Sequence, residues 1–566
     1  MRRPGTPRRD RCGLLTGDAF LVALTERQGH FAAILGAGSA TYSAGFPRCG
    51  ASPGDVARSD PGRFLHRDAR RHWPGQRRPE VVKPEAERRW FLLFAVEAAA
   101  LLAIRWPVLH TFKEYVFQDT GSVLAVQSLL SRGLRPEIDF GYNYGLLPLL
   151  FGKLAFGVFG NTPNTYAFAV TAIDLIVAIG LARIIAALRP DALTWMLALT
   201  TMPIVVVAFD NLAYAMEAAF LINGFAEQLR GRWLFAFAFA LCAALSKPAM
   251  GYIYAAILVV LTVRDAGLRG NVSIEIRRFL APLVAGGVVL VAILVGVFGF
   301  GSFIRTVFPL QGIHFYRMTG QLQPGYQHFQ RPPGANLNLF LGGYLAFNFA
   351  GDVWLAISAA LALFDLRKRR AGLVELFVLT TAALVLADAA VLTSHYGYIL
   401  PIGLIACATL TDWQRPALAA LTFLASIAFV RTIYQDLNLP RTQKRSLATG
   451  DLWTRTDIND EWLRAMEIAA GRRTVTLGEM GGAGLVLRGI EPPVGAFFLP
   501  GNALPSDLAR EYDQLASADV IVLFRRFSTV RGGTVLDSFP ELGPAVQGAA
   551  LVYDGKFLEV RARPRK

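Results

Sequence analysis

Apolar residues dominate the middle of the chain, in long runs separated by short polar stretches. Most of these runs approach the ~20 residues that a helix needs to cross a bilayer. The pattern predicts an all-α polytopic membrane domain over residues 90–434, with about eleven membrane-spanning helices. The predicted helices cover residues 90–109, 164–188, 192–209, 212–229, 233–247, 249–264, 279–301, 337–364, 372–393, 396–411 and 416–434.

Basic loops orient these helices. Residues 264–278 and 366–370 are rich in Arg and Lys, and loops of this kind concentrate on the cytoplasmic side of membrane proteins. Counting the spans from these loops puts several polar features together on the opposite, periplasmic or external, face. They are the 110–163 loop, Asp210-Asn211, Ser246-Lys247-Pro248, the 302–336 loop and His395-Tyr396.

One apolar run, residues 146–160, is short for a membrane span and contains Lys153. Counting it as a span would reverse the side of the segments that follow. We therefore predict an interfacial or re-entrant helix at the outer surface.

The two ends of the chain have a different pattern. In residues 435–566, β-rich runs at 473–479, 495–500, 519–524 and 550–560 alternate with helical periodicity at 461–470 and 506–516. Alternation of this kind is typical of a small α/β domain, which the span count places outside the membrane. Residues 1–89 are rich in Arg, Pro and Gly and are predicted to form a disordered cytoplasmic tail.

Composition agrees with a membrane protein, since 53% of the residues are hydrophobic, 17% are charged and the mean hydropathy is +0.39. The net charge of +15 does not indicate nucleic-acid binding, because residues 1–89 alone hold 17 Lys and Arg against 9 Asp and Glu. The four cysteines show no metal-ligand spacing and predict neither a disulfide framework nor a zinc site.

Three aspartates stand out, because ionisable groups close to a membrane are costly and are functional candidates. Each also has a structural interpretation. Asp119 begins a helical pattern and could be its N-cap. Asp139 precedes the strip FGYNYG, which could be an interfacial aromatic belt. Asp210 could be a turn residue between two spans.

The first external loop resembles that of the C-type (GT-C) glycosyltransferases, polytopic enzymes that take sugars from polyprenyl-phosphate donors. They include the protein mannosyltransferases and the lipid A aminoarabinose transferases. The matching residues of the loop are Asp119-Thr120-Gly121, Gln127, Leu129-Leu130, Gly133, Pro136, Asp139-Phe140, Tyr144-Gly145 and Pro148-Leu149. Looser counterparts of later motifs are Asp210, Ser246-Lys247-Pro248 and the segment from His395 to Pro401, so that the resemblance covers residues 90–410.

The resemblance implies roles for individual residues. Asp119 would be the general base that accepts the proton of an attacking acceptor hydroxyl, and Asp210 a second acid that orients acceptor or sugar. Positive charge would stabilise the departing phosphate, and Lys247 is the best-placed cation, unless it only extends its ammonium toward the interface. The remaining candidate substrate-binding residues are Asp139, Tyr142, Tyr144, Arg317, His395 and Tyr396.

The sequence departs from the aminoarabinose transferases in one respect that concerns the donor. These enzymes carry a Lys-Pro pair in the aromatic helix, where this chain has Tyr144-Gly145. Other cations must then contact the donor phosphate, or the donor differs. In the 302–336 loop, Arg305, Arg317, Arg331, His314 and His328 could bind phosphate or be ordinary solvated loop charge. The absence of an Asp-x-Asp motif from the first loop does not favour a metal cofactor.

The predicted function is an integral membrane glycosyltransferase of the bacterial cell envelope, in the inner membrane. It would move a sugar from a polyprenyl-phosphate donor to a lipid, glycan or protein acceptor on the outer face. The alternatives are a transporter or flippase for a lipid or lipid-linked sugar, and a non-catalytic assembly protein that acts through its C-terminal domain. The absence of an internal repeat and the gathering of polar residues on one face disfavour the transporter.

Overall fold

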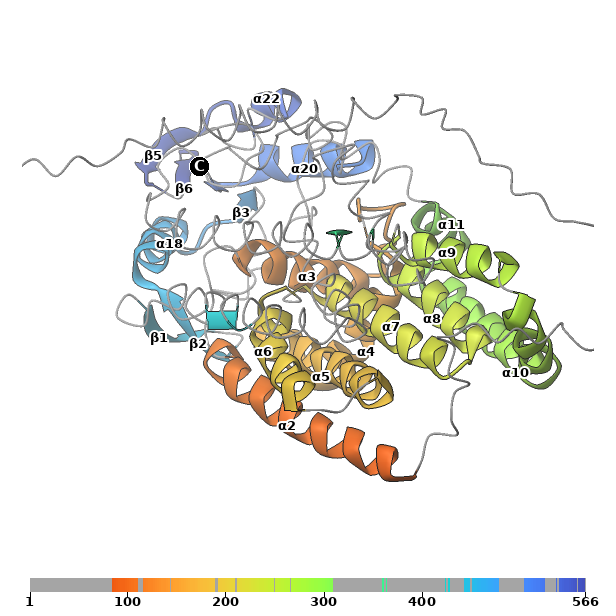
Figure 1. Ribbon diagram of the computed structural model, residues 1–566. Helices are drawn as coiled ribbons and strands as arrows, with labels where there is room; N and C mark the ends of the chain where they lie inside the picture. The colour runs from red at the N-terminus through yellow and green to blue at the C-terminus, as the bar shows by residue number, and fades with distance from the viewer. Residues whose placement is uncertain are drawn as a thin grey trace, which may run out of the picture. The chain divides into compact units, whose positions relative to one another are not determined.

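A computed structural model of the chain shows a helical region followed by a small C-terminal sheet (Figure 1). The chain divides into two compact units, Met1–Gln76 and Arg77–Lys566, and the first lies outside the described residues. The described residues are 84–109, 116–142, 144–188, 192–208, 211–248, 250–264, 266–308, 359–360, 363, 423, 426–427, 442–447, 450–477, 503–524, 536, 539–556 and 558–564.

The helical region follows the apolar runs of the sequence. Its elements are α2 (Pro84–Leu109), α3 (Val116–Ser131), α4 (Leu146–Phe159), α5 (Pro163–Leu188), α6 (Ala192–Ala208), α7 (Leu212–Leu229), α8 (Trp233–Ser246), α9 (Met250–Arg264), α10 (Ala266–Phe298) and α11 (Phe300–Val307). The first six predicted spans each correspond to one of these helices, and the short run at 146–160 forms α4. The four spans predicted between residues 337 and 434 lie almost wholly outside the described residues.

One boundary was predicted wrongly. Residues 266–278 were expected to be part of a cytoplasmic loop, but α10 begins at Ala266 and runs to Phe298. A helix of 33 residues is about 50 Å long at 1.5 Å per residue, well beyond ~30 Å of hydrocarbon. The basic residues therefore extend the helix past its apolar part.

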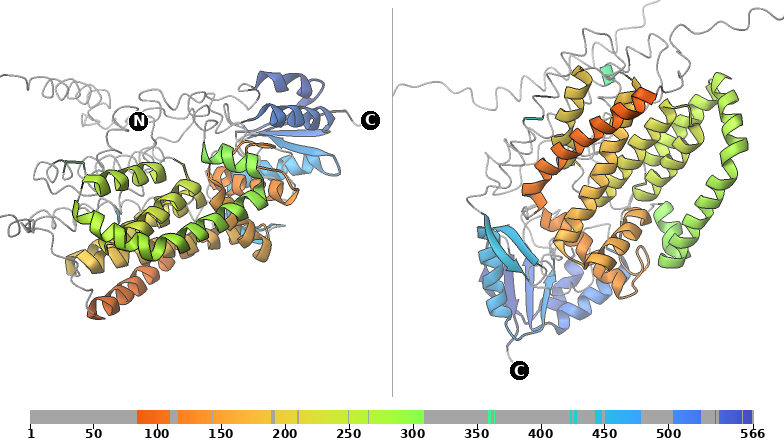
Figure 2. Two further views of the ribbon diagram at one scale, coloured as in Figure 1. Left: turned by 90° about the vertical axis from the view of Figure 1, so that its right-hand side faces the viewer. Right: turned by 90° about the horizontal axis from the view of Figure 1, so that it is seen from below.

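Small residues allow the helices to approach closely. Figure 2 shows α2 and α5 to α10 as elongated helices, and α7 packs against both α5 and α8. A Cβ atom added at Gly251 of α9 would lie 2.1 Å from the backbone nitrogen of Ala244 in α8. Contacts between small residues are typical of helix pairs in membranes, where backbones come into van der Waals contact.

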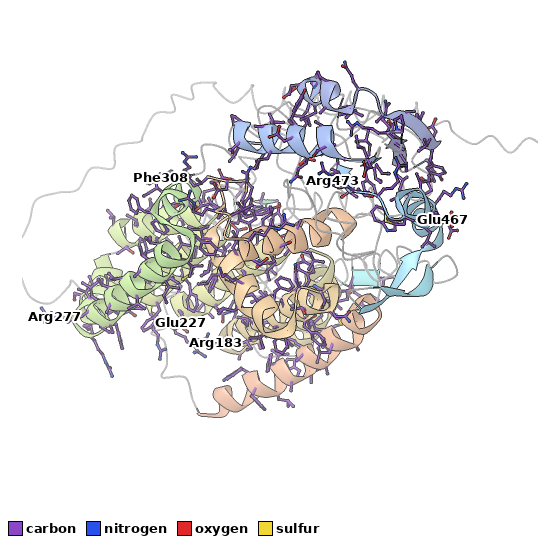
Figure 3. All side chains as sticks on the ribbon, turned by 180° about the vertical axis from the view of Figure 1, so that it is seen from behind. Arg183, Glu227, Arg277, Phe308, Glu467 and Arg473 are labelled. Atoms are coloured by element: carbon purple, nitrogen blue, oxygen red, sulfur yellow. The ribbon has the colours of Figure 1, made fainter. Side chains whose placement is uncertain are left out.

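Two ion pairs connect helices within this region. Arg105 of α2 donates to Asp174 of α5 at 2.6 Å, and both side chains are buried. Arg183 of α5 pairs with Glu227 of α7 (Figure 3). Buried charges are tolerated when they are paired in this way, so both pairs fix the register of neighbouring helices.

Two helices in the described part of the chain are long and apolar enough to cross a membrane, by length and composition. They are Asn164–Ala186 within α5 and Val272–Phe298 within α10. The first is mostly buried among other helices, whereas nearly all of the second is exposed. The total number of spans stays a prediction.

The C-terminal part forms a mixed four-stranded sheet with the strand order β3-β4-β6-β5. Strand β3 (Thr474–Leu477) is parallel to β4 (Val520–Phe524), whereas β6 (Leu558–Ala562) is antiparallel to both β4 and β5 (Ala550–Asp554). A separate hairpin, β1 (Thr442–Leu447) with β2 (Gly450–Arg455), precedes the sheet. Short helical turns at Pro540–Leu542 (η4) and Gly543–Val546 (α22) lead into β5.

Helices cover both faces of the sheet, which explains why every residue of β4 is buried. On one face Trp462 of α18 (Thr456–Ala469) stacks on Phe524 with the ring centroids 5.9 Å apart. On the other face Ile521 and Leu523 share a core with Leu515 of α20 (Pro505–Ser517). The predicted mixture of strands and helices in the C-terminal part is therefore confirmed, and its division from the helical region as a separate domain stays a prediction.

Candidate active site

The first loop of the sequence analysis makes a compact turn between α3 and α4. Gly133 has a φ of +79° and Glu137 a φ of +60°, and a bridge joins Pro136 to Phe140. The carboxylate of Asp139 accepts the backbone N–H of Arg135 at 2.9 Å and its Nε at 3.2 Å. The Asp139 side chain is thus held within the turn, and its predicted contact with substrate stays a prediction.

Glu137, which the sequence analysis did not select, organises the second half of the turn. Its side chain is buried, its carboxylate accepts the backbone N–H of Tyr142, and its carbonyl accepts Arg305 of α11 at 2.7 Å. Burial raises the pKa of Glu137 to about 7, against the opposing effects of the Tyr142 N–H and the Arg305 charge. Arg305, a candidate for phosphate binding, therefore holds this turn.

The turn leads into an aromatic ladder. The rings of Tyr142 and Tyr144 meet edge to face at 5.6 Å, and Tyr144 meets Tyr214 of α7 in the same way at 5.8 Å. The ammonium of Lys247 then lies 3.6 Å from the centroid of the Tyr214 ring. An aromatic face attracts an ammonium group in this position.

A close backbone contact brings the first loop to Lys247. The N–H of Gly145 donates to the carbonyl of Ser246 at 3.0 Å, where α8 ends and Lys247 begins the next loop. A Cβ atom on residue 145 would lie 1.8 Å from the carbonyl oxygen of Leu245. Glycine is required at this position because the two backbones touch. Tyr142, Tyr144 and Lys247, which the sequence predicted separately, are thereby brought together.

After Glu137, a second charged residue that the sequence analysis did not select is Glu217. It lies on α7, one turn after Tyr214, and is fully buried. Neither of its carboxylate oxygens has a hydrogen-bond partner among the described residues, and the charge of Lys247 interacts with it. The signal was present in the sequence, because Glu217 is a charged residue inside the apolar run of residues 212–229.

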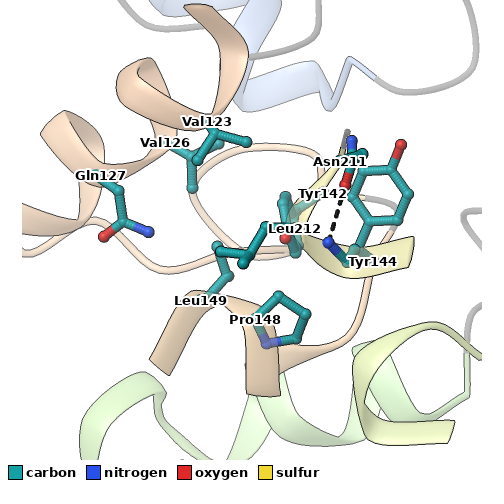
Figure 4. Close-up of a pocket in the computed structure, with 10 residues that line it drawn as sticks. Val123, Val126, Gln127, Tyr142, Tyr144, Pro148, Leu149, Asn211 and Leu212 are labelled. Atoms are coloured by element: carbon teal, nitrogen blue, oxygen red, sulfur yellow. Dashed lines mark hydrogen bonds between the residues drawn. The ribbon is translucent and has the colours of Figure 1, made fainter. Parts of the chain in front are cut away.

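A small cavity of about 10 Å³, the space of about one water molecule, lies beside the ladder (Figure 4). Within it, Asn211 accepts the N–H of Ala213 at 2.9 Å and so caps α7. The buried side-chain nitrogen of Gln127 has no hydrogen-bond partner in the described part of the chain. The cavity is lined by Val123, Val126 and Gln127 of α3, by Tyr142 and Tyr144, by Pro148 and Leu149 of α4, and by Asn211, Leu212 and Ala213.

The remaining predicted residues are not tested. Asp119 lies in α3, three residues after the helix begins at Val116, so it is not the N-cap; its side chain lies outside the described residues. Asp210, Arg317, His395 and Tyr396 also lie outside them. Among the described residues, no group of three or more His, Cys, Asp or Glu could hold a metal ion.

These contacts define what the site can do chemically. A cation and several phenol groups lie where the first loop meets the ends of α7 and α8. Lysine binds phosphate as a point charge, and tyrosine combines an apolar ring with a hydroxyl group. This combination suits an anionic head group that is attached to an apolar chain.

Two solved structures are similar to the chain. One is ArnT from Cupriavidus metallidurans bound to undecaprenyl phosphate, with 13% identity and a TM-score of 0.46, and the other is the same protein in the apo state, with 14% identity and a TM-score of 0.47. Each match covers 84% of this chain and 98% of the other. No protein-family model matches the sequence, and no curated protein matches it.

Proposed function

We propose that the protein is an integral membrane glycosyltransferase that takes its sugar from a polyprenyl-phosphate donor. The observation that carries this proposal is the contact of Gly145 with Ser246, which joins the aromatic strip of the first loop to the cation of Lys247. The sequence lacks the Lys-Pro pair of the aminoarabinose transferases in its aromatic helix. Lys247 supplies a positive charge from α8 to the same place.

The proposed reaction divides the work among three charged residues. Lys247 binds the donor phosphate and stabilises the negative charge that develops as it leaves the sugar. Asp119 accepts the proton of the acceptor hydroxyl while the oxygen attacks the anomeric carbon, a contribution of ~10²–10⁴ in rate. Asp210 orients the acceptor or the sugar. The acceptor is a lipid, a glycan or a protein.

The proposed location is the inner membrane of a bacterium. About eleven spans cross the inner membrane of a bacterium, with the basic loops in the cytoplasm. The first external loop, Lys247 and the C-terminal α/β domain face the periplasm or exterior. A site there would receive the donor directly from the outer leaflet.

Substitution of Lys247 tests the donor site. Lys247→Met removes the charge and keeps an unbranched side chain, so binding of undecaprenyl phosphate and the transfer rate should both fall by about 10–100-fold, the worth of a charged hydrogen bond. The matched control is Lys153→Met, because Lys153 is an exposed lysine of α4. Wild-type binding in Lys247→Met would rule out Lys247 as the phosphate ligand.

Substitution of Asp119 separates a transferase from a transporter. Asp119→Asn should slow sugar transfer in reconstituted membranes by about 10²–10⁴-fold while undecaprenyl phosphate still binds, because only the proton acceptor is lost. A wild-type protein that binds the lipid and translocates it without transferring sugar would contradict the enzymatic proposal.

A further inference from the structure

Helix α20 of the C-terminal sheet domain contacts the first-loop turn directly. The carboxylate of Asp507 accepts the backbone N–H of Gly141 at 3.0 Å. The guanidinium of Arg510, one turn further along α20, donates to the backbone carbonyl of Asp139. Two side chains of one helix thus bind the backbone on both sides of Phe140.

Two backbone N–H groups, one from the loop and one from the start of α20, hold the Asp507 carboxylate in this contact. Its side chain is only 2% exposed, and the same oxygen that binds Gly141 accepts the N–H of Leu504 at 3.0 Å. The second bond fixes the carboxylate at the start of α20, where the first-turn N–H groups favour negative charge. An aspartate held in this way presents a fixed acceptor to the loop.

The loop residues of this contact, Asp139 and Gly141, immediately precede Tyr142 of the aromatic ladder in the sequence. Gly141 precedes Tyr142, whose own N–H is bound by Glu137, and Arg305 holds the carbonyl of Glu137. The backbone from Glu137 to Tyr142 is therefore bound by α20, by α11 and by the turn itself. A loop fixed at several backbone groups leaves Tyr142 and Tyr144 little freedom to leave the ladder.

We propose that α20 positions the donor site, with Asp507 and Arg510 as positioning residues that hold the first-loop turn so that Tyr142 and Tyr144 stay in the aromatic ladder, which reaches Lys247 through Tyr214. This inference rests on the proposed function, and it gives the C-terminal domain a role in donor binding. The two residues act through the loop backbone and touch neither donor nor acceptor.

The test uses the full-length protein in lipid nanodiscs, with undecaprenyl-phosphate sugar as the donor. Asp507→Ala and Arg510→Met should each raise the KM for the donor by about tenfold or more while kcat and the KM for the acceptor change little, because the tyrosines lose their fixed position. Asp507→Asn keeps an oxygen that can accept the Gly141 N–H and should restore a KM near that of the wild type. Asp513→Ala, at an exposed position of α20, is the matched control and should behave as the wild type.

Hydrogen exchange of the peptide that covers residues 132–145 provides a second measurement, independent of activity. Exchange should be faster in Asp507→Ala than in Asp513→Ala, because the Gly141 N–H loses its acceptor. Unchanged exchange in Asp507→Ala would overturn the contact, and faster exchange with a wild-type donor KM would overturn its positioning role. A wild-type protein that neither binds nor uses the donor would instead refute the proposed function, and the exchange result would still decide whether α20 holds the turn.

Discussion

Gly145→Ala is the sharpest test of how the candidate site is assembled. The added Cβ would lie 1.8 Å from the Leu245 carbonyl oxygen, whereas real Cβ atoms stay beyond 3.0 Å. The loop and the end of α8 must separate by at least about 1.2 Å, the difference between these two distances. A shift of this size breaks the Gly145–Ser246 hydrogen bond, because N–H···O contacts beyond about 3.5 Å contribute little.

Both effects lower the free energy of unfolding of the Gly145→Ala variant. Overpacking against backbone atoms costs about 1–3 kcal/mol, and the lost hydrogen bond adds about 1 kcal/mol. We therefore expect Gly145→Ala to destabilise the protein by about 2–4 kcal/mol and to weaken binding of undecaprenyl phosphate at least tenfold, since the loop that carries Tyr144 moves away from the end of α8 that carries Lys247.

Thermal unfolding in detergent and lipid binding measure the two consequences on one sample. Gly157→Ala is the matched control, because Gly157 lies in α4 and an added Cβ there meets no atom within 4 Å. Alanine at this position should leave stability unchanged or raise it by up to about 1 kcal/mol. Wild-type melting and binding of Gly145→Ala would refute the proposed contact between the first loop and α8.

Three further predictions concern the rest of the fold. Arg105→Leu leaves the buried Asp174 without its arginine and should lower the free energy of unfolding by about 3–5 kcal/mol, measured by thermal unfolding. Adding Asp174→Leu to this variant should restore part of the lost stability. Gly251→Ala should lower the melting temperature because its Cβ meets the backbone of α8 at 2.1 Å, whereas Gly286→Ala, which meets nothing within 4 Å, should not. Burial raises the pKa of Glu511 from 4.5 to about 8, so the folded state binds the proton of this carboxyl more tightly than the unfolded state does. The free energy of unfolding therefore falls as the pH rises from about 4.5 through 8. Glu511→Gln should reduce this loss of stability between about pH 5 and pH 8.5.

The sequence predicts the local elements better than the contacts between them. The run DVIVLF has the length and β-branched content of a strand, and it forms β4 with both faces buried. The run at 550–560, predicted only as β-rich, forms strands β5 and β6, which pair as a hairpin and are separated at Asp554-Gly555. An Asp-Gly pair between apolar runs is a strong hairpin signal.

Tyr144 and Lys247 of the candidate site were selected from the sequence, whereas Glu137, Tyr214 and Glu217 were not. Tyr144 and Lys247 come from different segments, and the contact between these segments depends on a glycine packed against a backbone about 100 residues away. No local pattern encodes such a contact, since it arises only after the helices have packed. The same reason explains why the contact of Asp507 with Gly141 could not be foreseen.

The geometry of the first-loop turn also bears on which of its two aspartates can act as the base. A general base must present a free lone pair to the acceptor hydroxyl in a suitable position. One carboxylate oxygen of Asp139, Oδ2, already accepts two N–H groups of Arg135, and the backbone carbonyl of Asp139 accepts Arg510. Proton transfer to this oxygen would weaken the turn that carries Tyr142 and Tyr144, because a protonated carboxyl is a poorer acceptor. These contacts give Asp139 a role in shaping the loop, and the assignment of Asp119 as the base stays a prediction.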